Sequence, residues 1–130
     1  MISGTSAFLA IGLVRLENST NIAFMEPRLN EGEDYNRKTG VFTCRIPGFY
    51  WFSAGIQVAG MSVGVHCFIL QNNIQKLHIF ANENGITSSV SGAFRLKQGD
   101  LVQVGGCFGR EQLSGSDTIY FSGMLITPDV

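Results

Sequence analysis

Short stretches of alternating apolar and polar residues run through most of the chain. The clearest example is the segment 41–46, in which every second side chain is apolar. This period of two is that of a half-buried β-strand, because successive side chains of a strand point to opposite faces. The apolar face of this predicted strand carries Phe42, Cys44 and Ile46. Pro47 ends the strand, since proline lacks the N–H group that a β-ladder needs.

The segment 49–58 begins with four consecutive aromatic residues, Phe49, Tyr50, Trp51 and Phe52. Alternation places Tyr50 and Phe52 on one face of a second strand, in an apolar row that continues along it. Phe49 and Trp51 then lie on the opposite face, which an antiparallel sheet ordinarily gives to water. Both faces of this strand must therefore be covered. An overlying loop and a subunit interface are the two ways to cover the second face.

The remaining apolar segments predict further short strands, and the 22–25 strand is expected to end at Pro27. These segments are 7–16, 22–25, 65–70, 76–81, 90–97, 101–104 and 117–126. Asn72-Asn73 and Asn84-Gly85 between them are typical hairpin turns. No window of eleven or more residues free of glycine shows helical periodicity. The pattern predicts an all-β fold, a ten-stranded jelly-roll sandwich of two antiparallel sheets.

Composition narrows the functional classes. The chain has 130 residues, of which 45% are hydrophobic and only 15% charged. A globular protein usually has about 25% charged residues, so the low value favours a surface that is partly covered in an oligomer. The net charge of −1 gives no basic field for nucleic acid. The apolar runs are shorter than the about 18 residues of a membrane-spanning helix, so neither nucleic acid nor membrane insertion is expected.

The sequence carries no convincing catalytic motif. Residues 60–64 match the G-x-S-x-G pattern of a nucleophile elbow, but that motif requires a helix after the serine, and none is predicted. His66 and Cys67 are adjacent in a predicted strand and therefore point to opposite faces. His66 and His78 are not at a spacing typical of metal ligands. We therefore expect no catalytic residues, and a protein that is not an enzyme.

A set of spaced residues resembles the globular head domain of complement C1q, in the C1q/tumour necrosis factor superfamily. These residues are Phe24, Asn30, Tyr35, Phe42, Gly48, Tyr50 and Phe52. The segment 121–126 resembles the last strand of that family, so the resemblance spans nearly the whole chain. It implies one C1q-like domain over 6–130 after a flexible start at 1–5. Ala54 departs from the pattern, because the family usually has an aromatic residue there.

The resemblance also implies an assembly and a covalent bond. Members of that family are mostly extracellular, which implies a secreted protein, and they form compact trimers. A homotrimer would place Phe49, Tyr50, Trp51 and Phe52 in the trimer interface or the core. Chains of complement C1q carry bridged cysteines at places similar to Cys44 and Cys67, which implies a Cys44–Cys67 disulfide with Cys107 free. The alternative is that both are buried free thiols, a common role of cysteine.

Three polar segments are candidate sites. Asn18-Ser19-Thr20 fits the N-glycosylation pattern, which makes Asn18 the candidate acceptor. The acidic segment 30–34 is either a solvated turn or a ligand loop, and its clustered oxygens suit calcium, which some members of the family bind. Loop 109–116 is the third. The candidate ligand-binding residues in the acidic segment and in this loop are Glu31, Glu33, Asp34, Arg110 and Glu111.

Two functions fit the resemblance. The first is a non-catalytic recognition module of innate immunity, whose loops bind microbial, carbohydrate or anionic ligands. The second is a secreted trimeric signalling ligand that binds a protein receptor, like the hormones and synaptic organisers of the family. Binding in this family depends on variable loops, so the sequence leaves both open.

Overall fold

The computed structural model describes residues 4–15, 19–59, 64–83, 85–109, 112–114 and 117–129. Within these ranges the chain forms ten β-strands, which confirms the all-β prediction. The strands are β1 (Ala7–Arg15), β2 (Ile22–Glu31), β3 (Tyr35–Asn36), β4 (Val41–Thr43), β5 (Gly48–Gln57), β6 (Val65–Gln71), β7 (Ile74–Ala81), β8 (Thr87–Leu96), β9 (Leu101–Phe108) and β10 (Tyr120–Pro128).

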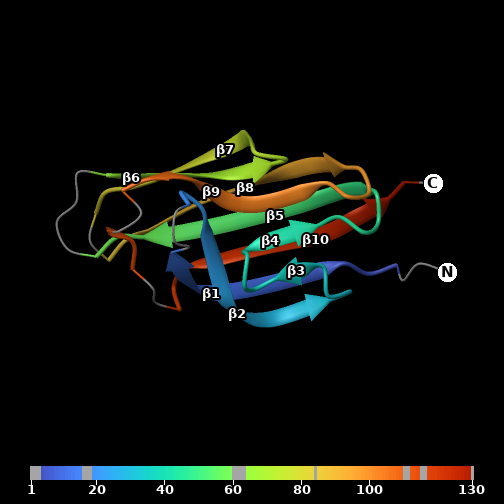
Figure 1. Cartoon of the computed structure of the whole chain (residues 1–130), viewed down its shortest axis with the longest axis horizontal. Helices are drawn as coiled ribbons and strands as arrows, with labels where there is room; N and C mark the ends of the chain where they lie inside the picture. The colour runs from blue at the N-terminus through green and yellow to red at the C-terminus, as the bar shows by residue number, and fades with distance from the viewer. Residues whose placement is uncertain are drawn as a thin grey trace.

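The strands form two antiparallel sheets that pack face to face as a jelly roll (Figure 1). The first sheet has the order β2-β1-β10-β5-β8, and the second has the order β3-β4-β9-β6-β7. β1 and β10, from opposite ends of the chain, lie side by side in the first sheet. Several strands that follow one another in sequence, such as β4 and β5, lie in different sheets, so the chain crosses repeatedly between the two layers.

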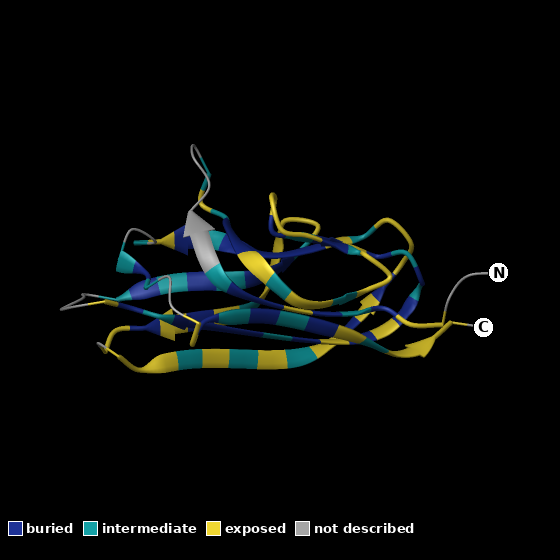
Figure 2. Cartoon of the chain, turned by 90° about the horizontal axis from the view of Figure 1, so that it is seen from below, coloured by how far each residue is buried: buried dark blue, intermediate teal, exposed yellow. Residues whose placement is uncertain are grey.

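The core between the sheets contains a cluster of aromatic rings. Figure 2 shows buried and more exposed residues alternating along the strands, as the period of two predicts. Phe8 is central, because its ring centroid lies 4.7 Å from that of Tyr35, 5.4 Å from Phe42 and 4.9 Å from Phe121. These distances fall in the range in which aromatic pairs attract beyond their buried area.

Gly123 shows how tightly these rings pack against the backbone. It lies in β10 directly opposite Phe8 and directly opposite Phe52 of β5. A Cβ atom at this position would lie 2.5 Å from the Phe52 ring and 2.7 Å from the Phe8 ring. The close approach of the two rings therefore requires a residue without a side chain.

Several predicted strand ends are wrong, among them that of the segment 101–104, which β9 extends to Phe108. β2 does not end at Pro27 but continues to Glu31. Proline is tolerated because β2 is the edge of its sheet, where a missing N–H costs no ladder bond, and because the register with β1 shifts there. The strand predicted over 41–46 ends at Thr43, since the N–H of Cys44 donates instead to the carbonyl of Asp100, at 2.8 Å.

The Asn72-Asn73 turn joins β6 to β7 as predicted. Both residues have positive φ, 51° and 65°, the conformation of a tight hairpin turn that asparagine tolerates. Asp100 ties this turn to the one between β8 and β9, because its carboxylate accepts hydrogen bonds from Asn72 Nδ2 at 3.1 Å and from the Lys97 N–H at 2.8 Å. The Lys97 N–H and the Asn72 side chain lower the pKa of Asp100.

Candidate functional site

The outer face of the first sheet is apolar. Tyr50 and Phe52 of β5 are fully buried, whereas Phe49 and Trp51 leave 41% and 44% of their surface exposed. The alternation predicted for this strand is therefore confirmed: Tyr50 and Phe52 belong to the core, and Phe49 and Trp51 lie on the surface of the single chain.

Neighbouring strands extend this surface. Met124 of β10 lies directly opposite Trp51, and Leu9 of β1 lies directly opposite Leu29 of β2. We call five exposed large apolar side chains on this side of the first sheet the apolar face. Its members are Leu9, Leu29, Phe49, Trp51 and Met124. A single chain thus exposes large apolar side chains on four neighbouring strands, which marks an interaction surface better than scattered residues do.

A row of serines borders the apolar face. Ser122 of β10, Ser53 of β5 and Ser91 of β8 are register partners across the sheet. Ser53 is hydrogen-bonded through its hydroxyl to that of Tyr120, at 2.8 Å. Because serine side chains are short, another chain can approach the backbone closely in this part of the sheet.

Arg95 closes the other side of the apolar face. Its guanidinium lies 4.6 Å from the centroid of the Phe49 ring and forms a salt bridge of 3.0 Å with Asp129. The cation–π contact and the salt bridge fix the guanidinium at the rim of the face.

The acidic segment has a structural role at Asp34. The Asp34 carboxylate accepts hydrogen bonds from Ser6 Oγ at 2.6 Å and from Arg45 Nε at 3.0 Å, and only 8% of its side chain is exposed. Arg45 also donates to the carbonyl of Thr5, at 2.9 Å. Asp34 therefore links the chain before β1 to the segment after β4. Glu31 and Glu33 are the exposed carboxylates of this segment.

An open hollow of about 500 Å³ lies beside Glu33. Its lining residues are Pro27, Asn30, Glu33, Tyr35, Asn36, Arg37 and Lys38. Arg37 and Lys38 are exposed, so the hollow presents two cations and one carboxylate to solvent. This arrangement can bind a ligand that carries both hydroxyl groups and negative charge.

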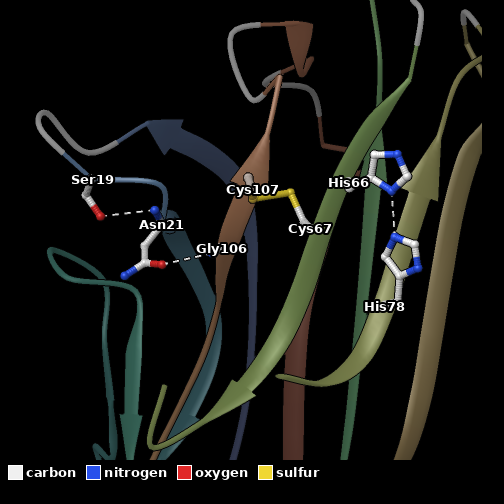
Figure 3. Close-up of a disulfide and its surroundings, with 7 residues drawn as sticks. All are labelled: Ser19, Asn21, His66, Cys67, His78, Gly106 and Cys107. Atoms are coloured by element: carbon white, nitrogen blue, oxygen red, sulfur yellow. Dashed lines mark hydrogen bonds between the residues drawn. A yellow bond between two sulfur atoms is a disulfide. The ribbon is translucent and has the colours of Figure 1, made fainter. Parts of the chain in front are cut away.

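The predicted Cys44–Cys67 disulfide is wrong. The structure instead bonds Cys67 of β6 to Cys107 of β9, with Cα atoms 4.2 Å apart (Figure 3). The order of the second sheet explains the error: β9 lies between β4 and β6, so Cys44 is separated from Cys67 by a whole strand. Neighbouring strands are about 4.8 Å apart, and Cα atoms two strands apart exceed the reach of a disulfide.

Cys44 is a buried free thiol. Its Sγ donates to the carbonyl of Ile46 at 3.2 Å and lies 3.8 Å from the hydroxyl of Tyr50. Burial raises the pKa of the Cys44 thiol, which keeps it protonated and unreactive.

Three other candidates lie outside the described residues: Asn18, Arg110 and Glu111. In the part of the chain that the structure describes, no three His, Cys, Asp or Glu side chains gather as metal ligands. Among the same residues, no helix has the length and apolarity that crossing a membrane would need.

Known proteins resemble this chain in sequence and in fold. The family model described as "C1q domain" matches residues 7–126. One of the subunits of the complement C1q subcomponent from Rattus norvegicus is 33% identical over 113 residues, which cover 83% of this chain and 44% of the relative. The hibernation-associated plasma protein HP-20 from Tamias sibiricus is 31% identical over 112 residues, which cover 84% of this chain and 56% of the relative. The chain thus spans about half the length of these relatives.

Solved structures agree with the fold. The globular domain of zebrafish complement 1qA superposes with a TM-score of 0.72 at 20% identity, over 98% of this chain and 100% of that one. Murine APRIL superposes with a TM-score of 0.71 at 13% identity, over 94% of this chain and 99% of that one. The match of the family model over residues 7–126 is what shows the family: the chain belongs to the C1q domain family.

Proposed function

We propose that this chain is the homotrimeric, non-catalytic head of a secreted recognition protein of innate immunity, and that it binds anionic carbohydrate on microbial surfaces. The observation that carries the proposal is the apolar face centred on the opposed pair Trp51 and Met124. An extracellular recognition or ligand role agrees with the family and with relatives named as a complement subunit and as a plasma protein.

The apolar face supports self-association. Trp51 and Met124 leave 44% and 53% of their surface in water in the single chain. A second copy of the same sheet can cover such a face, and a closed ring buries the face in every subunit. A threefold ring is the assembly that the resemblance to C1q heads implies. The row of serines beside Trp51 lets the sheets approach, while Ala54 is fully buried and does not contribute to the face.

The hollow beside Glu33 supports ligand binding. Arg37 and Lys38 lie in the turn between β3 and β4 of the second sheet, and their side chains are exposed. Cations at a polar rim suit sulfated, phosphorylated or uronic sugars, because charged hydrogen bonds are stronger than neutral ones. Three copies per trimer would turn weak single contacts into avidity on a repeating surface.

Light scattering tests the assembly. The wild-type chain should have three times its monomer mass of 14.1 kDa. Trp51→Glu should shift it toward monomer, because the carboxylate would lose water in the interface. Ile74→Glu is the matched control, since Ile74 is exposed to a similar or greater degree but lies in the second sheet. A wild-type monomer at micromolar concentration overturns the homotrimer.

A glycan array with lipopolysaccharide spots tests the ligand class. The double variant Arg37→Ala/Lys38→Ala should lose binding to anionic sugars, while Lys97→Ala, an exposed lysine in another turn, should retain it. A screen against receptor ectodomains runs in parallel. If the trimer binds no glycan on the array but binds one receptor at nanomolar concentration, it is a signalling ligand. The recognition proposal then fails.

A further inference from the structure

Two histidines meet on the outer face of the second sheet. His66 lies in β6 and His78 in β7, and Figure 3 shows their rings pointing toward each other across the two strands. His66 Nδ1 and His78 Nε2 are 2.7 Å apart. A neutral pair can share one proton in this position, with one nitrogen as donor and the other as acceptor.

The two rings meet edge to edge. Their planes differ by only 10°, and their centroids are 4.9 Å apart, which is well beyond the 2.7 Å between the nitrogens. The two nitrogens therefore lie between the centroids and face the same gap. Two imidazole nitrogens that face one gap can serve together as ligands of one metal ion, once both rings turn toward it.

A β-bulge creates this pair. Near the Asn72-Asn73 turn, Leu70 pairs with Gln75, but further along Ile69 pairs with Leu77, so Lys76 is an extra residue. Without this shift His78 would lie opposite Cys67, and its side chain would point to the other face from His66. With the shift, Phe68 lies opposite His78 and Phe80 lies opposite His66, so both histidines share the outer face.

Aromatic neighbours hold the rings in place. The centroid of Phe68 lies 4.8 Å from that of His78, and the centroid of Phe80 lies 4.6 Å from that of His66. The four rings form a row in which the two histidines occupy the middle. Packing on both flanks limits the rotamers of the histidines, so less entropy is lost when a ligand binds.

We propose that His66 and His78 form a two-histidine site for a late first-row divalent metal ion, such as Zn²⁺, Ni²⁺ or Cu²⁺. Zinc–nitrogen bonds of about 2.0–2.1 Å in tetrahedral geometry separate two ligand nitrogens by about 3.3 Å. Outward rotation of the two partly exposed rings widens the present 2.7 Å to that spacing and turns both nitrogens toward one point. When the ion enters, the proton shared by the pair moves through solvent to the ring nitrogen of the same histidine that faces away from the ion, so both imidazoles stay neutral.

The protein supplies two ligands, and water or an external ligand supplies the others. Cys67 is adjacent to His66, but its sulfur is directed into the core and bonded to Cys107. Lys76 is exposed on β7, two residues before His78, and its charge opposes a cation. The site should therefore be weaker than a structural zinc site of four ligands and should prefer Cu²⁺ over Ni²⁺ and Zn²⁺, following their general order of affinity. The site lies on the second sheet and does not depend on the proposed function of the apolar face.

Calorimetry with zinc, nickel and copper chlorides tests the site on protein prepared without a histidine tag. The chain contains only these two histidines, so His66→Gln and His78→Gln each leave one. We expect one ion per wild-type chain, and a loss of at least about tenfold in affinity in either variant, because the chelate becomes a single contact. Lys76→Gln, on the same strand, should bind at least as tightly as the wild type. Calcium chloride should not bind there, since hard cations prefer oxygen ligands.

Nitrogen NMR of the imidazoles gives a second measurement that does not depend on stability. Added Zn²⁺ should shift His66 Nδ1 and His78 Nε2 together and leave the other ring nitrogens protonated. Either of two results overturns the proposal: no binding to wild-type protein at millimolar metal, or equal binding by the double variant His66→Gln/His78→Gln. A metal-induced shift that appears on His66 Nε2 instead of Nδ1 also overturns it.

Discussion

The hydroxyl of Tyr35 makes two hydrogen bonds to the backbone of Phe24. It accepts from the Phe24 N–H at 2.9 Å and donates to the Phe24 carbonyl at 2.8 Å. Phe24 lies in β2, an edge strand, so the tyrosine satisfies backbone groups that have no further strand beside them. Asn30 completes this arrangement, because its side-chain amide pairs with the N–H and carbonyl of Tyr35. Three of the residues that carry the family resemblance thus form one hydrogen-bonded unit.

We expect Tyr35→Phe to lower the free energy of unfolding by about 1–3 kcal/mol, because two buried backbone groups lose their partner. Urea unfolding measures the change. Tyr120→Phe is the matched control, since its hydroxyl is hydrogen-bonded to the side chain of the half-buried Ser53 and should matter less. An equal effect of both substitutions would contradict the assigned role.

The buried hydroxyl of Tyr35 should make the stability of the fold sensitive to alkaline pH. Burial raises the pKa of Tyr35 from 10.0 to about 12. Between these values the unfolded chain has already released the proton while the folded chain retains it, so stability falls as pH rises through this range. Wild-type protein should therefore lose stability more steeply than Tyr35→Phe over that window, as followed by thermal unfolding at each pH. Parallel slopes would show that Tyr35 does not titrate with folding.

How much the sequence predicts depends on the range of the contact. The alternation of Phe49 and Trp51 with Tyr50 and Phe52 is local, so the faces of β5 were predicted correctly. The disulfide partner of Cys67 depends on which strand lies next to β6, and strand order in a sandwich is not encoded in local alternation. Similarly, His66 and His78 meet only because one extra residue shifts the register of their hairpin.

Reduction of the disulfide should be costly. Cys67 and Cys107 are 40 residues apart, and closing a loop of this length stabilises the folded state by about 4 kcal/mol in the chain-entropy model. The double variant Cys67→Ala/Cys107→Ala should unfold at clearly lower denaturant concentration. Cys44→Ala is the control with the disulfide intact. Peptide mapping without reduction should give a linked Cys67–Cys107 pair, and a linked Cys44 peptide would contradict the assignment.

Asp34→Asn should destabilise the fold by about 1–3 kcal/mol, since it removes the charge that accepts hydrogen bonds from Arg45 and Ser6 in a largely buried place. Glu33→Gln, one residue earlier and exposed, should be nearly neutral for stability. Chemical denaturation compares the two variants. If both lose stability equally, the effect comes from the net charge of the segment and not from the Asp34–Arg45 pair.

Asp100 should affect how the stability of the fold changes in acid. Its carboxylate accepts hydrogen bonds from the Lys97 N–H and from Asn72, which lower its pKa in the folded state. A lowered folded pKa contributes stability above the unfolded value near 3.8, and this contribution is lost as pH falls through the folded value. Asp100→Asn should therefore be less stable than wild type at neutral pH, and the difference should shrink as pH falls below that value. Asp117→Asn, at an exposed turn residue, should track the wild type throughout. A constant gap between Asp100→Asn and wild type down to the acid transition would mean that Asp100 acts by shape and not by charge.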